Sequence, residues 1–361
     1  MAQLNLFFLL KLSFVVLIAP TCVSGKHYRT TKLGAKNGFV STKLDHLSLN
    51  DSPEYDVYNY TQTLDHFNFN PESYTTFQQR YIVNSEYWGG PTNSSPIFLY
   101  AGAEADIMED VEANGFEQVL ASRFKALLVY IEHRYYGTSM PFGSKDEAYK
   151  NASTLGYFTS EQALADYAQI IIDVKKNMSA DNCPVIAIGA SYGGMLSSWF
   201  RMKYPHVAYG ALASSAPILY FLGLTPENGY SSVVSKDFNS TSTSCYNTIK
   251  ESWSEIDRVA AQPQGLWNLT QTFNTCMAIN TTQDLKYNLE GIYGILAQYD
   301  DPTGTLIKTF CNVTDMAGEE TYILDKIVAG IRTMIGSVCF DLRDKGFNKD
   351  IGWDWQHVRR M

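Results

Sequence analysis

A serine in a glycine-rich turn is the strongest chemical signal in this sequence. Gly189-Ala190-Ser191-Tyr192-Gly193 fits the pattern G-x-S-x-G, which places a nucleophilic hydroxyl on a sharp turn between a strand and a helix. The small residues beside the serine let the backbone segments approach each other closely. The Tyr192 amide, at the start of the helix, would help to bind a developing oxyanion. We therefore expect acyl-transfer chemistry with Ser191 as nucleophile, the alternative being a glycine-rich turn with a solvated serine.

Short apolar runs and helical patterns alternate around this turn, between about residue 79 and residue 215. Val185–Ile188 precedes the turn, and a helical stretch from Gly194 to Tyr204 follows it. Thr159 and Gln162 have the spacing of a capping box before another helical pattern. Further apolar runs of strand length lie at residues 97–101, 126–131 and 208–213. Buried strands that alternate with helices predict an α/β fold whose parallel sheet is covered on both faces.

Five acidic residues cluster around the expected start of a helix over Glu109–Arg123. Negative side chains are favoured at a helix N-terminus by the helix dipole, so we interpret them as solvated acids. Binding of a substrate ammonium group is the alternative interpretation. The five residues are Glu104, Asp106, Glu109, Asp110 and Glu112.

A nucleophilic serine needs a base to take its proton and a carboxylate to orient that base. Two histidines follow Ser191 in the sequence. His206 ends the helix that begins at the nucleophile, and 15 helical residues place it roughly 22 Å away. His357 lies among the last five residues, with no later strand to position it. Asp65 and His66 are adjacent, so in an extended segment their side chains point to opposite faces and do not pair.

The composition indicates a folded, acidic protein. The chain has 361 residues, is 45% hydrophobic and 18% charged, and can bury a sizeable core. Its formal net charge of −9 makes nucleic acid a poor partner for the whole molecule. The sequence contains no H-E-x-x-H motif, Walker A loop or Rossmann glycine fingerprint. We therefore expect neither a metal nor a cofactor.

The pattern changes after about residue 222, where apolar residues recur at helical spacing. Such stripes are typical of core-facing positions on amphipathic helices, so a mainly helical unit is expected there. The three stripes are Ile249, Trp253, Ile256 and Ala260; Leu285, Leu289, Ile292 and Leu296; and Ile323, Ile327, Ile331 and Met334.

The first 25 residues have the pattern of a secretory signal peptide. Leu4–Ala19 is mostly apolar, and Val23-Ser24-Gly25 would satisfy a signal-peptidase site before Lys26. An uncleaved anchor is the alternative, and no later segment is long and apolar enough to span a membrane. Nine Asn-X-Ser/Thr sequons behind such a signal predict a glycosylated surface. The candidate asparagines are Asn50, Asn59, Asn93, Asn151, Asn177, Asn239, Asn268, Asn280 and Asn312.

The cysteines also indicate an oxidising compartment. Cys22 would leave with the signal peptide, and the wide spacing of the others resembles no zinc site, which favours disulfides. Their number is odd, so either one thiol stays free or its partner is not in this chain. The five remaining residues are Cys183, Cys245, Cys276, Cys311 and Cys339.

Several longer motifs resemble the prolyl-specific serine exopeptidases of peptidase family S28. Gly189–His206 (GASYGGMLSSWFRMKYPH) closely resembles the nucleophile region of that family, and Glu132–Gly143 (EHRYYGTSMPFG) resembles a second motif. Within the second motif, we interpret His133 as a packed loop residue. Three shorter stretches also resemble family motifs, at residues 64–67, 159–165 and 211–217. The resemblance runs from about Thr61 to Trp355.

This resemblance implies an α/β-hydrolase fold with an inserted, mainly helical, disulfide-containing cap domain. The expected domains are a signal peptide over residues 1–25, the N-terminal part of the hydrolase domain over 26–222, and a shortened cap domain over 223–361. It further implies that Ser191 is the nucleophile, with backbone oxyanion donors at Tyr192 and Gly102. This sequence departs from the usual Gly-Asn-Glu at the loop that follows Gly102.

The resemblance also implies cleavage after proline near a peptide end, in a lysosome, a vacuole or the extracellular space. The family carries its catalytic Asp and His in a segment that follows the equivalent of Gly352–Gln356. This chain diverges at His357, so we expect a C-terminally shortened form without that pair. Carboxypeptidase and dipeptidyl-peptidase action both remain open, as does the oligomeric state, a homodimer included. The alternatives are a non-catalytic relative that binds peptides or a partner, and an esterase or lipase on the same fold.

Overall fold

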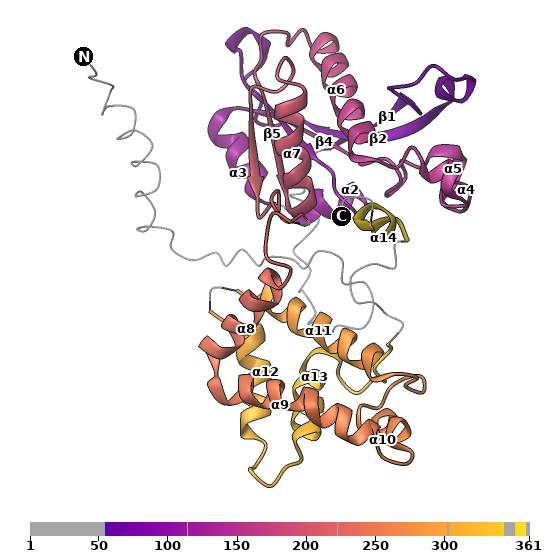
Figure 1. The fold of residues 1–361 in the computed structure, drawn as a ribbon. Helices are drawn as coiled ribbons and strands as arrows, with labels where there is room; N and C mark the ends of the chain where they lie inside the picture. The colour runs from indigo at the N-terminus through magenta and orange to yellow at the C-terminus, as the bar shows by residue number, and fades with distance from the viewer. Residues whose placement is uncertain (1–54, 114, 222, 302, 343–350, 359–361) are drawn as a thin grey trace, which may run out of the picture. The chain divides into compact units, whose positions relative to one another are not determined.

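The structure is a computed structural model that describes two stretches of the chain, residues 55–342 and residues 351–358 (Figure 1). Within the first stretch, residues 114, 222 and 302 are not described. The expected signal peptide and Asn50 lie outside the described residues. Within the described part of the chain, no helix is long and apolar enough to cross a bilayer. We refer to residues 55–221 as the α/β part and to residues 223–342 as the helical part.

The α/β part is built on one six-stranded sheet with the strand order β1-β2-β4-β3-β5-β6. Strands β4, β3, β5 and β6 run parallel, as the alternating pattern predicts, whereas β1 and β2 form an antiparallel hairpin that joins the sheet beside β4. This hairpin adds a polar, half-exposed extension beside the buried strands β4 and β3, whereas β6 at the opposite edge of the sheet is largely exposed. The strands are β1 (Asp56–Thr63), β2 (Thr76–Asn84), β3 (Ile97–Ala101), β4 (Leu127–Ile131), β5 (Val185–Ala190) and β6 (Gly210–Ser214).

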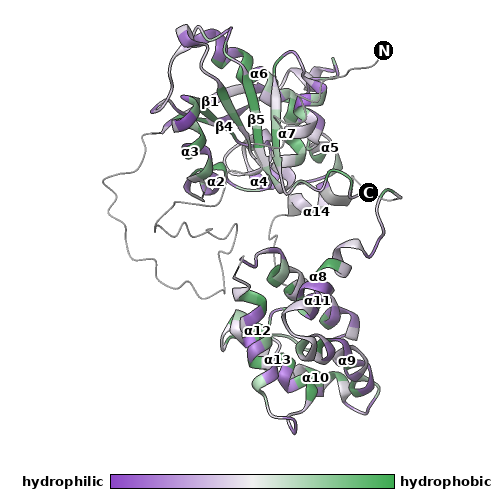
Figure 2. Cartoon of the chain, turned by 90° about the vertical axis from the view of Figure 1, so that its left-hand side faces the viewer, coloured by the Kyte–Doolittle hydropathy of each residue, from purple (hydrophilic) through white to green (hydrophobic). Residues whose placement is uncertain are grey.

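Every residue of β3 and β4 is buried because helices cover both faces of the sheet. Leu99 and Val129 pack with residues of α6 and α7 in one apolar cluster. Phe98 and Leu128 point to the other face and pack with residues of α2 and α3. Figure 2 shows the green of hydrophobic residues along β4 and β5. The helices of this part are α2 (Ile107–Ala113), α3 (Gly115–Phe124), α4 (Lys145–Ala148), α5 (Ala152–Leu155), α6 (Ser160–Asn177) and α7 (Ser191–Lys203).

One helix boundary follows directly from the side chain at its end. The hydroxyl of Thr159 accepts a hydrogen bond from the Gln162 amide, which makes Thr159 the N-cap of α6 as its spacing predicts. The helix expected over Glu109–Arg123 corresponds to α2 and α3, which the structure describes on either side of residue 114.

The helical part contains the amphipathic helices that the apolar stripes predict. Ile249, Leu289 and Ile327 are buried in one cluster that spans all of its helices. Trp253 and Met334 lie at the border of that cluster and are only partly buried. The helices are α8 (Gly229–Thr241), α9 (Thr243–Ala260), α10 (Gly265–Thr272), α11 (Thr282–Gln298), α12 (Thr305–Met316) and α13 (Ile323–Ile335).

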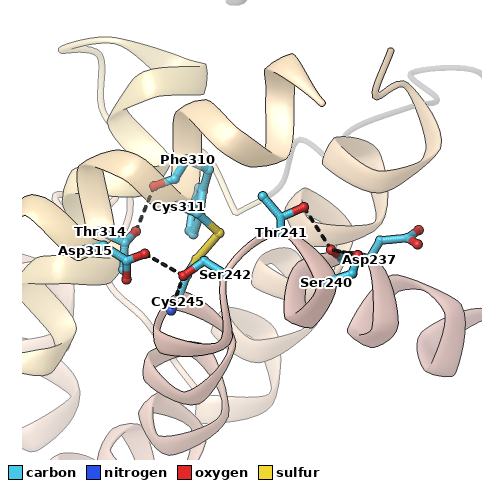
Figure 3. The surroundings of a disulfide bond; sticks show 9 residues. All are labelled: Asp237, Ser240, Thr241, Ser242, Cys245, Phe310, Cys311, Thr314 and Asp315. Carbon is cyan, nitrogen blue, oxygen red and sulfur yellow. Dashed lines mark hydrogen bonds between the residues drawn. A yellow bond between two sulfur atoms is a disulfide. The ribbon is translucent and has the colours of Figure 1, made fainter. Parts of the chain in front are cut away.

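Two disulfides hold the helical part together. Cys245 on α9 is bonded to Cys311 on α12, and Figure 3 shows this bond beside Ser242, the N-cap of α9. Cys276 is bonded to Cys339. Cys183 is the free thiol, and it is 1% exposed in the apolar core of the α/β part. Burial raises the pKa of this thiol, so the odd cysteine is an inert core residue.

A mixed sheet covered by helices and a helical, disulfide-tied part match the fold class that the sequence predicts. The expected domain boundaries at residues 25 and 222 stay predictions.

Candidate active site

Ser191 lies at the junction between β5 and α7. β5 ends at Ala190, whose backbone is extended, and α7 begins at Ser191 itself. Ser191 has a φ of +53°, in the left-handed region that L-residues seldom occupy. A non-glycine residue held in this conformation is costly, and such residues cluster at functional sites. The side chain is exposed at the turn, where a substrate could reach it.

Three glycines around Ser191 are required by close backbone contacts. A Cβ atom on Gly189 would lie 2.3 Å from the Gly193 oxygen, and one on Gly193 would lie 2.7 Å from the Ala101 oxygen. A Cβ atom on Gly194 would lie 2.9 Å from the Ser214 oxygen. Each of these contacts is with backbone, which does not move aside. The glycines therefore let the turn pack between the ends of β3 and β6.

The hydrogen bonds of the loop that follows β3 do not agree with the expected role of Gly102 as an oxyanion donor. The Gly102 amide donates a hydrogen bond of 3.0 Å to the Ile131 oxygen, so this donor is already taken and does not serve as the expected oxyanion donor. The same close approach explains the glycine, since a Cβ atom there would lie 2.4 Å from the Ile131 oxygen. Ala103, the next residue, lies nearer the nucleophile turn, 3.5 Å from a Cβ built on Gly193. The role of the Tyr192 amide stays a prediction.

The side chain of Tyr192 anchors the turn in a buried polar cluster. Its hydroxyl lies 2.9 Å from Nε2 of His133 and 3.3 Å from the Ser160 hydroxyl. Nδ1 of His133 lies 2.6 Å from the Arg134 carbonyl oxygen, so Nδ1 carries the proton and Nε2 accepts from Tyr192. His133 is fully buried. It is therefore a packed structural residue, as we interpreted it from the sequence.

A helix near the C-terminus, α14 (Ile351–Val358), contacts the same cluster. Nε2 of Gln356 lies 3.3 Å from the Tyr192 hydroxyl, and its Oε1 accepts a hydrogen bond of 2.8 Å from Tyr136. The Trp353 ring lies 5.5 Å from the Tyr192 ring. Tyr192, which follows the nucleophile, is thus held by side chains of the α/β part and of α14.

Arg134 and Asp166 form an ion pair in which both side chains are 0% exposed. Two parallel hydrogen bonds of 2.7 and 2.6 Å join the guanidinium to the carboxylate. Nη1 of Arg134 also donates to the Leu64 oxygen at 2.7 Å. Nε2 of His66 lies 2.7 Å from Oδ1 of Asp166. The motif residue Arg134 therefore joins α6 to the segment before β2.

Asp65 and His66 do not pair with each other, as their adjacency predicts. The carboxylate of Asp65 accepts hydrogen bonds from the Phe67 amide and from Asn68 and Gln162. Although burial acts against it, these hydrogen bonds lower the pKa of Asp65 to about 2. The two residues therefore belong to a structural hydrogen-bond network.

Glu132, the first residue of the second motif, organises the tight turn that follows it. Its Oε2 accepts hydrogen bonds from the amides of Thr138 and Ser139, both at 2.9 Å, and its Oε1 forms an ion pair with Arg80. A Cβ atom on Gly137, which has a φ of +52°, would lie 1.9 Å from the Glu132 carboxylate. The motif is thus a folded turn, and none of these residues bears on the chemistry directly.

Among the described side chains, no histidine forms a hydrogen bond with Ser191. His66 is bound to Asp166, and His133 to Tyr192. His206 lies beyond the last residue of α7 and packs near Tyr204, with 6.1 Å between ring centroids. The side chain of His357 lies outside the described residues. The described part of the chain therefore supplies a nucleophile turn without its base.

The candidate glycosylation sites are at the surface wherever the structure describes them. Such exposure is required for glycosylation, which stays a prediction. The exposed asparagines are Asn59, Asn93, Asn151, Asn177, Asn239, Asn268, Asn280 and Asn312.

Comparison with known proteins supports the motif resemblance. The family described as serine carboxypeptidase S28 matches residues 62–346, which is more than half of the chain. The lysosomal Pro-X carboxypeptidase of Homo sapiens is 44% identical over 234 residues, 64% of this chain and 46% of that protein. Its counterpart in Mus musculus is 40% identical over 280 residues, 76% of this chain and 53% of that protein.

A more distant relative is the thymus-specific serine protease of Mus musculus. It is 32% identical over 246 residues, which cover 65% of this chain and 46% of that protein. The chain spans about half the length of the curated relatives that it matches.

Proposed function

Because this chain belongs to the serine carboxypeptidase S28 family, we propose that it acts as a serine exopeptidase that cleaves after proline near a peptide end. One observation carries the proposal, the geometry of Ser191. Its positive φ, its exposure and its place between β5 and α7 are the features of a nucleophilic serine on this fold. The α/β-hydrolase fold with a helical, disulfide-containing domain supports the same chemistry.

In the proposed mechanism, Oγ of Ser191 attacks the carbonyl carbon of the scissile bond while a base takes the hydroxyl proton. The Tyr192 amide and the Ala103 amide bind the oxyanion, with Ala103 taking the role first expected for Gly102. The base then gives the proton to the leaving amine, which leaves an acyl-enzyme at Ser191. Water, deprotonated by the same base, hydrolyses the ester and restores the serine.

We propose that the base and its orienting carboxylate are a His and an Asp from sequence beyond this chain. Two observations support this. His66 and His133 are bound elsewhere, and this chain spans about half the length of the matched relatives. In comparable serine hydrolases, loss of the base costs about 10⁶ in kcat. From a typical kcat near 10 s⁻¹, that leaves roughly one turnover per day.

We further propose a carboxypeptidase specificity, since the similar relatives from Homo sapiens and Mus musculus are Pro-X carboxypeptidases. Their lysosomal description, the expected signal peptide and the exposed sequons support a location in the secretory pathway, in a lysosome, a vacuole or outside the cell. A proline-containing peptide is then the partner of the site.

The second candidate function is peptide binding without catalysis. The observation that favours it is the absence of a histidine bonded to Ser191 among the described side chains. A peptide could still occupy the site, because the nucleophile turn and its glycine packing do not depend on a base.

Fluorophosphonate labelling of the secreted, glycosylated chain, extended by its natural C-terminal sequence, separates the two functions. Such probes react appreciably only with an activated serine, so the proposed peptidase predicts labelling of the extended chain at Ser191, mapped by peptide mass spectrometry and lost in Ser191→Ala. Circular dichroism confirms that both forms are folded. The chain without the extension should not be labelled, because the proposed base is missing from it. A folded, extended chain without labelling would overturn the proposed peptidase.

Specificity for one peptide end is then measured with two substrates, one blocked at its amino terminus and one blocked at its carboxyl terminus. An N-blocked Pro-Phe dipeptide offers only a carboxypeptidase bond, whereas an X-Pro amide with a free amino terminus offers only a dipeptidyl-peptidase bond. We expect hydrolysis of the first and not of the second.

A further inference from the structure

Two carboxyl groups of the α/β part are buried where helices α2 and α3 cover the sheet. Asp110 on α2 is 2% exposed and Glu117 on α3 is 5% exposed. Asp110 is therefore not the solvated acid that its place near a helix start predicts. The residues around them are apolar and include Val111 and Ala121. Burying a carboxylate in such surroundings is costly unless a partner compensates its charge.

The hydrogen bonds available to these carboxyls are incomplete. Oδ1 of Asp110 accepts from the Tyr100 hydroxyl at 3.2 Å. Oδ2 of Asp110 and Oε2 of Glu117 have no hydrogen-bond partner among the described residues. The Tyr130 hydroxyl, which is also fully buried, has none either. A protonated carboxyl tolerates this setting far better than an ionised one.

The charges around Asp110 also act against its ionisation. Every titratable group found to interact with it is an acid or a tyrosine, and no cation is among them in the described part of the chain. These groups are Glu109 of its own helix, Glu117 of α3, Glu104 of the preceding loop, Tyr100 of β3, Tyr130 of β4 and Tyr167 of α6.

We propose that the layer formed by α2 and α3 is a pH-sensitive element, stable when the buried Asp110 and Glu117 are protonated in acid and weakened as the pH rises and they ionise. The pH dependence of this layer does not require catalytic activity, so its test is independent of the proposed peptidase function. It lies beside the loop that carries Gly102 and Ala103, because α2 begins at Ile107. Neutral pH would therefore loosen the structure that follows this loop.

The direction and size of the effect follow from linkage. Burial raises the pKa of Asp110 to about 7, and the Glu104 and Glu117 carboxylates add to it; burial also raises the pKa of Glu117. A carboxyl whose pKa is raised by folding stabilises the protein fully below its unfolded pKa, and this stability is lost as pH rises through the folded value. For Asp110 alone, the unfolding equilibrium constant would rise ~70-fold between pH 5 and pH 7.5.

Equilibrium unfolding in urea at pH 5 and pH 7.5 tests the proposal on the secreted, full-length chain. The wild type should unfold more readily at pH 7.5, and Asp110→Asn combined with Glu117→Gln should abolish most of that difference. Glu112→Gln is the matched control, since it removes an exposed acid from the same helix, and it should retain the wild-type difference. A double variant with the full wild-type pH dependence would overturn the proposal.

A second variant keeps the test decisive if the double variant does not fold. Tyr100→Phe removes the hydrogen bond that favours the ionised form of Asp110. The pH at which the wild type loses stability should then shift upward by up to ~1 unit. An unchanged or lower midpoint would contradict the role assigned to Asp110.

Discussion

Removal of the charge on Asp166 tests how much the fold depends on its buried ion pair. Asp166→Asn keeps the shape of the side chain but leaves the Arg134 guanidinium buried without a counter-charge. Both side chains are fully buried and joined by two hydrogen bonds shorter than 2.8 Å. Breaking a buried pair by removing one partner costs about 3–5 kcal/mol. At about 2–4 °C per kcal/mol, the melting temperature should fall by roughly 6–20 °C.

The assay is thermal unfolding followed by circular dichroism at pH 6. Asp181→Asn is the matched control, because Asp181 is exposed in the same part of the molecule, and it should change the melting temperature by less than ~2 °C. Arg134→Met combined with Asp166→Leu removes both charges and should recover much of the loss, because no charge is then left buried alone. A loss below ~1 kcal/mol in Asp166→Asn, or a double variant less stable than Asp166→Asn, would refute this reasoning.

Three further predictions concern the nucleophile turn, a disulfide and a carboxylate. Gly193→Ala places a Cβ atom 2.7 Å from the Ala101 oxygen; it should cost about 1–3 kcal/mol and displace the turn, measured by urea unfolding and by loss of any fluorophosphonate labelling. Replacing Cys245 and Cys311 by Ser opens a loop of sequence separation 66 and should cost ~2–4 kcal/mol, measured by thermal unfolding. Hydrogen bonding holds the pKa of Asp65 at about 2, so its stabilisation is complete above pH ~4 and lost as pH falls toward 2. Asp65→Asn should therefore flatten acid unfolding over that range, and an unchanged acid transition would count against this.

Local sequence patterns predicted the nucleophile turn correctly because its geometry depends on neighbours in the chain. The strand, the turn and the helix around Ser191 are contiguous, and small residues next to it are what the close packing requires. Thr159 as a helix cap is another local feature that the sequence contains in full.

Features that depend on distant pairing could not be predicted in the same way. The Gly102 amide is bound to Ile131 because of the register between β3 and β4, which no short motif specifies. Asp166 lies 32 residues from Arg134 and 100 from His66, and the helical pattern that contains it does not specify either partner.

The burial of Asp110 was missed for a related reason. Its position near a helix start is compatible with solvation, and only the fold shows that this side of α2 lies against β3 and β4.

The distribution of the cysteines has a consequence for biosynthesis. Both disulfides lie in the helical part, after residue 244, and their loops interleave because Cys276 falls between Cys245 and Cys311. The α/β part leaves the ribosome first and contains Cys183 alone, which its own core encloses. If that core forms during synthesis, Cys183 is withdrawn from thiol exchange before any later cysteine arrives. Synthesis from the N-terminus thus keeps the Cys183 thiol from forming disulfides with the later cysteines. The four later cysteines then have three possible disulfide pairings among themselves, fewer than if Cys183 could also react.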